Sequence, residues 1–398
     1  MATYVFVNLP AFGHINPTLP IVRELIARGE HVVYFVPQEF QALIESTGAS
    51  FRSLPALRTA SSGRANTPPG DHQIGLMPVA MAMQAREAVG YLAAQIEQIR
   101  PDCMVYNTLS LWARLVAHLL DIPRVGFRPF HAPRIRPSPT SPSSDGRAVA
   151  FAAAADRELE KLASDFRHAP QTLSDVLSQV EDPTLIFMPK EFQSRSETFD
   201  ERFLFVGSSL PHSTPMLWPL PISSRSHPLR VYVSLGTLRN DEPAFYRSCF
   251  DAFCGNEWQV VMSVGNRIDI PSLGPIPANF VVAESVPQLA LLPSVNVFIS
   301  HGGLNSVMES LYFGIPLVVI PTIKEQYLTA TRISDLGLGI VLDHATVTST
   351  SLREAAERAA SDPTIRGRIA DMQSSNRMAG GFLKAADAVQ RVARIGRT

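Results

Sequence analysis

Short hydrophobic runs alternate with longer amphipathic segments along most of the chain. The runs have the length and apolar continuity of buried strands, and the segments between them repeat apolar residues at helical spacing. This alternation predicts an α/β fold with parallel sheets that helices cover on both faces. The predicted strands are Tyr4–Asn8, His31–Val36, Cys103–Tyr106, Arg124–Phe127, Leu185–Phe187, Phe203–Val206, Arg230–Ser234, Gln259–Met262, Phe280–Ala283, Val297–Ser300 and Leu317–Ile320.

Helices fit between most of these strands. Asn16 stands where it can cap the first helix, and Pro17 occupies that helix's first turn. The last helix, Phe382–Ile395, repeats apolar residues near helical spacing and therefore has one face to bury. The other predicted helices are Pro17–Arg28, Gly75–Arg100, Leu111–Leu120, Glu242–Phe253, Leu304–Phe313, Gln326–Leu336 and Leu352–Ala360.

Three stretches rich in proline and serine interrupt the alternation. Ala56–Asp71 and Pro129–Gly146 follow predicted strands and are expected to be surface loops at the mouth of the ligand cleft. Ser208–Pro228 has the composition of an interdomain linker. The predicted division is an N-terminal domain over 1–210, a linker over 211–228, a C-terminal domain over 229–381 and a final helix over 382–398.

The composition is that of a globular chain with enough apolar residues for two cores. Of 398 residues, 45% are hydrophobic and 18% charged, and the net charge of −1 gives no basic field for nucleic acid. The longest apolar stretch, near Leu311–Ile323, is broken by glycine and proline, so no membrane span is expected. Met1–Val7 lacks the features of a signal peptide, and the three cysteines form no disulfide or metal pattern. We therefore expect a cytoplasmic enzyme.

A histidine lies in the first loop after a predicted strand. The segment Leu9–Pro17 contains His14 and lacks the GxGxxG fingerprint of dinucleotide-binding proteins. The positive end of the following helix disfavours the imidazolium, and a neutral histidine in a cleft can accept a proton from a hydroxyl. Taken alone, the pattern fits a turn histidine that hydrogen-bonds the backbone equally well.

The strand Val297–Ser300 runs through two glycines into a predicted helix. Gly302 and Gly303 let the backbone approach a ligand, and the N–H groups at the helix start attract phosphate. His301 can donate to the same diphosphate. Asn305 and Glu309 share one helix face, where a carboxylate can accept hydrogen bonds from both hydroxyls of a ribose. The alternative, a tight turn with a solvated glutamate, explains fewer of these coinciding groups.

Three further polar loops follow predicted strands in the second half. Each is weak evidence by itself, because such side chains are usually solvated. Together they supply groups for the remaining parts of a nucleotide sugar. They are Ser234, Gly236 and Thr237 for phosphate oxygens, Gln288 for a base edge, and Glu325 with Gln326 for vicinal sugar hydroxyls.

The segment from His301 to Glu309, the following Tyr312–Leu317 and the pair Glu325-Gln326 resemble the nucleotide-sugar signature of the family 1 UDP-glycosyltransferases. The bacterial macrolide-glycosyltransferase type is the most similar, and the start Gly13–Pro17 matches the same family. The resemblance covers nearly the whole chain. It implies the GT-B fold, in which two Rossmann-like domains face each other across an interdomain cleft and the C-terminal helix crosses back to the N-terminal domain.

The resemblance also implies a reaction. A hexose, with glucose as first choice, would pass with inversion from a UDP-sugar to a hydroxyl or another nucleophile of a small apolar or aromatic natural product, without metal or cofactor. His14 would be the general base. The diphosphate would meet His301, Gly303, Asn305 and Ser306; Glu309 would hold the ribose, Val286 and Gln288 the uracil, and Glu325 with Gln326 the sugar. The aromatic candidates for the acceptor pocket are Phe12, Trp112, Phe127 and Phe130.

Two positions depart from the family pattern. The aspartate that usually orients the base histidine is replaced by Asn107, whose amide oxygen can accept from the imidazole but cannot offset its charge. Ser285 stands where an aromatic ring often stacks on uracil, which weakens the preference for uridine over thymidine. Two other functions stay open: an isomerase such as a nucleotide-sugar 2-epimerase, against which the His14 loop argues, and a protein that binds the nucleotide sugar without turnover, which Asn107 keeps open.

Overall fold

The computed structural model describes residues 1–54, 88–132, 146–166, 172–178, 180–211, 229–237, 240–255 and 258–396. The predicted loop Ala56–Asp71, the first part of the helix Gly75–Arg100, residues 133–145 and most of the predicted linker lie outside the described residues. The chain forms two compact units. The first comprises Met1–Phe187, Arg195–Ser209 and Ala379–Thr398, and the second Met188–Ser194 and Leu210–Met378. The short segment Met188–Ser194, which the sequence analysis gave to the first domain, thus packs with the second.

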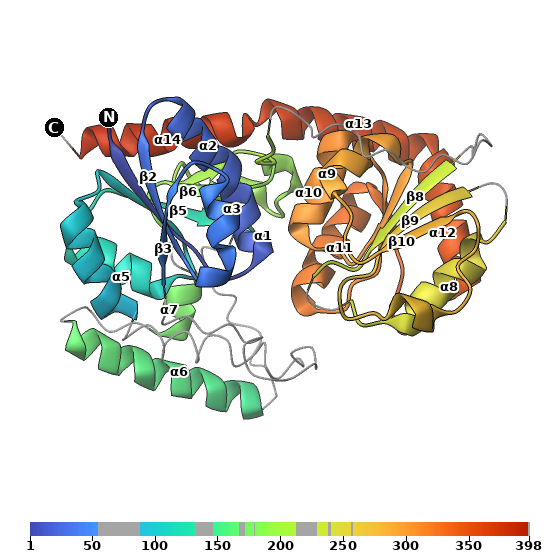
Figure 1. The fold of residues 1–398 in the computed structure, drawn as a ribbon, viewed down its shortest axis with the longest axis horizontal. Helices are drawn as coiled ribbons and strands as arrows, with labels where there is room; N and C mark the ends of the chain where they lie inside the picture. The colour runs from blue at the N-terminus through green and yellow to red at the C-terminus, as the bar shows by residue number, and fades with distance from the viewer. Residues whose placement is uncertain are drawn as a thin grey trace. The chain divides into compact units, whose positions relative to one another are not determined.

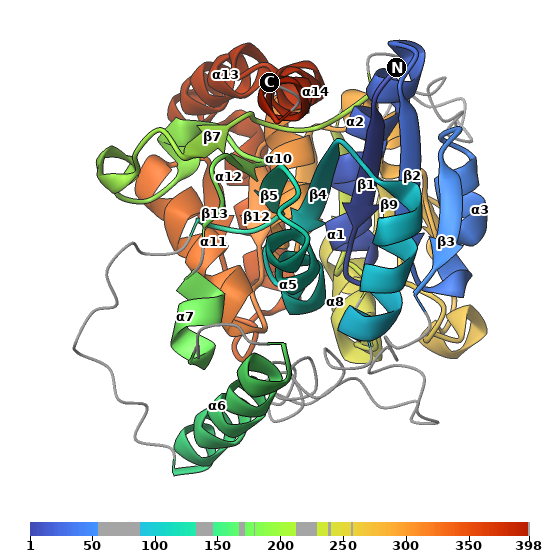
Figure 2. The same ribbon diagram turned by 90° about the vertical axis from the view of Figure 1, so that its left-hand side faces the viewer.

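In the first unit, the described residues form a parallel seven-stranded sheet in the order β3-β2-β1-β4-β5-β6-β7. Tyrosine, phenylalanine and valine dominate the central strands, whose side chains are buried on both faces. Figure 2 shows β4 between β1 and β5, as the hydrogen-bond registers require. The strands are β1 (Thr3–Val7), β2 (His31–Val36), β3 (Ser50–Ser53), β4 (Cys103–Asn107), β5 (Arg124–Arg128), β6 (Thr184–Ile186) and β7 (Phe203–Phe205).

Helices cover both faces of this sheet and enclose two apolar cores. One core lies under α2 and α14, which run beside each other in Figure 1, and the other lies under the helical residues 88–99 and α5. Arg28, the C-cap residue of α2, pairs with Asp387 on α14. The helices of the first unit with printed bounds are α1 (Phe12–Ile15), α2 (Leu19–Ala27), α3 (Gln41–Glu45), α5 (Leu111–Leu119), α6 (Gly146–Asp165), α7 (Leu173–Ser178) and α14 (Gly381–Ile395).

The start of the first helical segment differs from the prediction. Asn16 was expected to cap it, but the chain turns helical already at Phe12, after an extended Ala11. Asn16 itself has helical backbone angles and opens a 3₁₀ turn, Asn16–Thr18, that leads into α2. A residue inside a helical turn cannot act as its N-cap, because the capping position needs an extended backbone.

In the second unit, the described residues form a parallel six-stranded sheet in the order β10-β9-β8-β11-β12-β13. Its apolar core lies beneath α8 and α12, and α10 packs against α13 (Figure 1). The strands are β8 (Leu229–Ser234), β9 (Trp258–Ser263), β10 (Phe280–Ala283), β11 (Val297–Ser300), β12 (Leu317–Val319) and β13 (Gly339–Val341). The helices are α8 (Pro243–Phe253), α9 (Gln288–Leu291), α10 (Leu304–Phe313), α11 (Lys324–Leu336), α12 (Ser349–Ser361) and α13 (Pro363–Met378).

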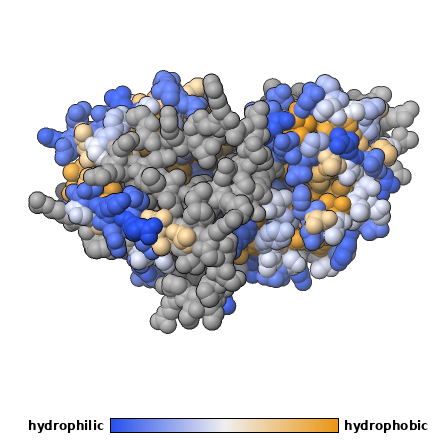
Figure 3. Space-filling view, turned by 90° about the horizontal axis from the view of Figure 1, so that it is seen from below, coloured by the Kyte–Doolittle hydropathy of each residue, from blue (hydrophilic) through white to orange (hydrophobic). Residues whose placement is uncertain are grey.

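Every strand predicted from the sequence is present within two residues of its predicted bounds. Among the elements that were not predicted, β3 has three polar residues of four, β13 has three residues, and α13 is mostly polar, whereas the helices α3, α6, α7 and α9 were simply not identified. On the face seen in Figure 3, the described surface mixes hydrophilic with hydrophobic residues. No helix within the described ranges is both long and apolar enough to cross a membrane.

Candidate functional site

His14 and Asn107 meet at one edge of the first unit's sheet. His14 lies in α1, directly after β1, and Asn107 is the last residue of β4. These two strands are parallel neighbours, so their carboxyl ends lie together, which is where ligands bind in such sheets. Asn107 Nδ2 lies 2.7 Å from His14 Nδ1. The pairing that the sequence analysis predicted is therefore present in the structure.

The hydrogen bond between Asn107 and His14 runs in the opposite direction to the prediction. We expected the amide oxygen of Asn107 to accept from the imidazole, but the N–H group faces His14 instead. The oxygen is taken by the backbone N–H of Leu109, at 3.0 Å. Asn8, a fully buried residue that the sequence analysis overlooked, lies on the other side and accepts from Asn107 Nδ2 at 3.4 Å. A polar residue at the end of an otherwise apolar strand was the signal that could have identified it.

Burial lowers the pKa of His14 from its ordinary 6.5 to about 4. The imidazole is therefore neutral at pH 7, as predicted from the sequence. The cause of the shift in the structure is burial of the ring.

The aromatic candidates for the acceptor divide into two groups. The ring centroid of Phe130 lies 6.0 Å from that of His14, and Phe12 is 51% exposed on α1. Trp112 and Phe127 were predicted wrongly, since both side chains are buried in the cores that flank the sheet. Large aromatic residues on a helix or strand of this fold fill the interior first. The guanidinium of Arg128, which no motif indicated, stacks 4.5 Å from the centroid of the Phe130 ring.

In the second unit, β11 leads through His301, Gly302 and Gly303 into α10. Gly302 has φ +86°, and Gly303, the N-cap of α10, has no side chain with which to cap the first N–H groups of the helix. A Cβ on Gly236 would lie 2.5 Å from His301 Cε1. Glycine at position 236 thus leaves room for the His301 imidazole at the helix start.

His301 is half-buried, and burial lowers its pKa to about 4 although a hydrogen bond with the Ser234 backbone opposes the shift. Its Nδ1 atom has no hydrogen-bond partner among the described residues. Ser234 is buried and accepts from the backbone N–H of Gly236 at 3.3 Å, while Thr237 is exposed in the same turn. The two loops that follow β8 and β11 therefore lie together at the carboxyl edge of the sheet.

Gln288, the first residue of α9, contacts two residues on one face of α10, Ser306 and Glu309. Gln288 Nε2 donates to Glu309 Oε2 at 2.5 Å and to Ser306 Oγ at 3.4 Å. Burial raises the pKa of Glu309 from 4.5 to about 7 and outweighs the opposing hydrogen bond from Gln288. Val286, the predicted contact of the base through its backbone, is buried two residues before Gln288.

The remaining candidates lie at the N-terminal turns of α10 and α11. Asn305 is half-buried in the first turn of α10, one residue before Ser306. Glu325 is exposed in the first turn of α11. Gln326 is buried, and its side-chain oxygen accepts from the backbone N–H groups of Thr322 and Ile323 and from the Thr322 hydroxyl. This oxygen is therefore occupied by the loop, and only the amide nitrogen of Gln326 is left for a sugar.

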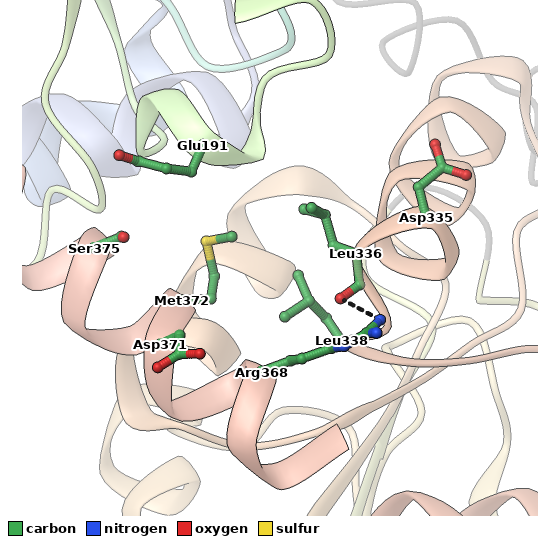
Figure 4. A pocket seen from close by; sticks show the side chains of 8 residues that line it. All are labelled: Glu191, Asp335, Leu336, Leu338, Arg368, Asp371, Met372 and Ser375. Atoms are coloured by element: carbon green, nitrogen blue, oxygen red, sulfur yellow. Dashed lines mark hydrogen bonds between the residues drawn. The ribbon is translucent and has the colours of Figure 1, made fainter. Parts of the chain in front are cut away.

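A separate hollow of about 420 Å³ lies in the second unit, where Glu191 faces α13 (Figure 4). Arg368 donates across it to the carbonyl oxygen of Leu336 at 3.3 Å. None of the predicted site residues lines it, and it combines charges of both signs without a buried polar group. Among the described residues, no three His, Cys, Asp or Glu side chains are grouped so as to hold a metal ion.

Comparison with known proteins gives consistent results across the chain. Residues 250–380 match the model of the erythromycin biosynthesis protein CIII-like C-terminal domain. The chain is 36% identical to NDP-glycosyltransferase YjiC of Bacillus subtilis, over 96% of this chain and 95% of that protein. It is 32% identical to demethyllactenocin mycarosyltransferase of Streptomyces fradiae, over 98% and 86%. The solved structure of the glycotransferase of kitacinnamycin superposes with a TM-score of 0.85 at 28% identity, over 98% of both chains.

Proposed function

Because this chain belongs to the family 1 glycosyltransferases of the bacterial macrolide type and has their GT-B fold of two Rossmann-like domains, we propose that it transfers a hexose from a UDP-sugar to a small aromatic natural product. Glucose is the first choice of sugar, and the anomeric configuration is inverted. The acceptor nucleophile is a hydroxyl. The enzyme needs neither metal nor cofactor.

The contact between Gln288 and Glu309 is the main support for a nucleotide donor. In a nucleoside the base and the ribose are joined directly, so their protein partners must also be neighbours. An amide can read the edge of a pyrimidine, and an adjacent carboxylate can accept from both ribose hydroxyls. The 2.5 Å separation of the two side chains fits these paired roles.

The diphosphate then extends toward the N-terminus of α10. Gly303 offers no side-chain cap, so the N–H groups of Leu304 and the next residues can bind phosphate oxygens, which the helix dipole also attracts. His301 and Ser306 flank this turn. These groups stabilise the charge that develops on the diphosphate when the bond to C1 of the sugar breaks.

At the acceptor side, we assign His14 to the nucleophilic hydroxyl and Phe130 to the flat face of an aromatic acceptor. A hydroxyl that attacks C1 from the side opposite the diphosphate inverts that carbon. Inversion is therefore the outcome of a single displacement without a covalent enzyme intermediate.

Incubation with UDP-glucose and 7-hydroxycoumarin, followed by mass spectrometry and proton NMR, tests the proposal. A β-glucoside from the α-linked donor is expected. A rearranged sugar nucleotide would instead identify an isomerase, and binding without any product would identify a protein that only holds the donor. Replacing UDP-glucose with dTDP-glucose tests the preference for uridine. Ser285 stands where an aromatic ring often stacks on uracil, so the protein offers the base no ring at this position.

A further inference from the structure

The hydrogen bonds around His14 determine which ring nitrogen carries the proton. Asn107 Nδ2 can only donate, so His14 Nδ1, 2.7 Å away, must accept. A neutral imidazole that accepts at Nδ1 carries its one proton on Nε2. Nε2 is the nitrogen left for a ligand, and in this tautomer it is a donor that has no lone pair with which to take up a proton.

The Asn107 amide cannot rotate by half a turn without losing other hydrogen bonds. Its oxygen accepts from Leu109 N, and its nitrogen also faces Asn8 Oδ1. Asn8 is fixed in turn, because its oxygen accepts from Leu9 N at 2.8 Å and its nitrogen donates to the carbonyl oxygen of His14 at 2.8 Å. A rotated Asn107 would place donor against donor at Leu109 and oxygen against oxygen at Asn8. The backbone thus fixes the orientation of the amide.

We propose that Asn107 holds His14 as the neutral Nε2–H tautomer, and that the chain therefore glycosylates acceptors that ionise by themselves, such as phenols, in preference to alkyl alcohols. The proposal rests on the transferase function proposed above and specifies its acceptor class. His14 acts as a hydrogen-bond donor to the acceptor oxygen. Asn107 is a positioning residue, because it acts through His14.

The transfer to a phenol needs no protein base. The phenol first loses its proton to solvent, and Nε2–H of His14 stabilises the resulting phenolate. The phenolate oxygen forms a bond to C1 of the sugar while the bond from C1 to the diphosphate oxygen breaks. The electron pair of that bond leaves with the nucleoside diphosphate. An alkyl alcohol ionises only far above neutral pH, so its proton would require a base that this tautomer does not supply.

The charges near the network also favour an anionic acceptor. Arg128 stacks on Phe130, which neighbours His14, and burial lowers the pKa of Arg128 only to about 9, so its charge persists at pH 7. The Tyr34 hydroxyl hydrogen-bonds Asn8 at 2.9 Å and stays neutral, because burial raises its pKa to about 12. No carboxylate in the described ranges hydrogen-bonds or pairs with His14.

Nitrogen-15 NMR of the full chain, labelled at histidine and assigned with His14→Gln, reads the tautomer directly. We expect the proton on Nε2 in the wild type and on Nδ1 in Asn107→Asp, since a carboxylate can only accept. If the aspartate variant does not fold, Asn107→Ser is measured in its place. A serine hydroxyl can accept from Nδ1–H while it donates to Asn8, so the proton is again expected on Nδ1. A wild-type chain with its proton on Nδ1 overturns the proposal.

Initial rates with a phenol series and benzyl alcohol test the acceptor class. We expect wild-type kcat/KM to be at least ~100-fold higher for phenols, and Asn107→Asp to raise the alcohol rate at least ~100-fold, the lower end of the usual scale of general-base catalysis. Asn296→Asp, an exposed site whose oxygen accepts from Arg230 N, is the matched control and should change neither rate. Equal wild-type rates for both classes overturn the acceptor assignment while leaving the transferase function intact. The absence of glycoside with every acceptor and donor refutes the transferase function and the acceptor class together, and the NMR result still decides the tautomer.

Discussion

Gln288 Nε2 donates a hydrogen bond to Glu309 Oε2 over 2.5 Å in the second unit. The two residues come from separate helices, α9 and α10, and lie 21 positions apart in the sequence. Their contact joins the group assigned to the base with the group assigned to the ribose, and it leads to two predictions about Glu309.

Glu309→Ala should raise the KM for the nucleotide sugar about 10- to 100-fold with a smaller change in kcat. Measured at pH 8, above the Glu309 pKa of about 7, the variant loses a charged hydrogen-bond acceptor worth roughly 1.5–3 kcal/mol. Steady-state kinetics with varied donor measure the effect, and Glu354→Ala, at an exposed site on α12, is the control. A normal donor KM in a chain with a normal melting curve would contradict the ribose assignment.

Glu309 should also make stability depend on pH. Burial raises its pKa from 4.5 to about 7, so the folded chain keeps this proton to higher pH than the unfolded chain. The stability that the proton contributes is complete below pH 4.5 and is lost as the pH rises through about 7. Glu309→Gln cannot ionise, so relative to the wild type it should gain roughly 1–3 kcal/mol between pH 4.5 and 8.

Urea unfolding at pH 4.5 and pH 8 measures this difference. Glu354→Gln, whose side chain is exposed, should shift the stability equally at both pH values. The assignment of the raised pKa fails if Glu309→Gln and the wild type differ by the same amount at the two pH values.

Activity should survive chelation by EDTA. The N–H groups at the start of α10, together with His301, are placed to bind the diphosphate that divalent ions neutralise in other transferases. Initial rates before and after EDTA treatment, with Mg²⁺ added back, measure the dependence. Complete loss of turnover that Mg²⁺ restores would show that a metal takes part.

Val389→Asp should destabilise the first unit by about 3 kcal/mol or more, because it places an unpaired charge in an apolar core. Val389 is fully buried in the core that α2 and α14 share, and the ion pair between Arg28 and Asp387 joins the same two helices. Arg391→Ala, at an exposed position of α14, is the control. A soluble Val389→Asp chain with wild-type stability would show that α14 is dispensable for this unit.

The sequence by itself determined the sheet elements and the loops that bear the candidate chemistry. Strands of parallel sheets are buried on both faces, so their apolar runs stand out in the sequence, and β2, β10 and β11 have the bounds that were predicted. Glycines and a histidine between β11 and α10 marked the candidate site of the second unit, because these residues lie next to each other in the sequence. Elements with mixed polarity, such as β3 and α13, were missed because they cover less apolar surface.

Only the tertiary structure decided how the side chains meet. Whether an aromatic residue faces a ligand or the core depends on the partner elements, and these place Trp112 and Phe127 in the interior. The orientation of the Asn107 amide likewise depends on Leu109 N and on Asn8, which lies 99 residues away. A hydrogen bond has a direction that neighbouring donors and acceptors fix, and no local pattern encodes neighbours brought in from another strand.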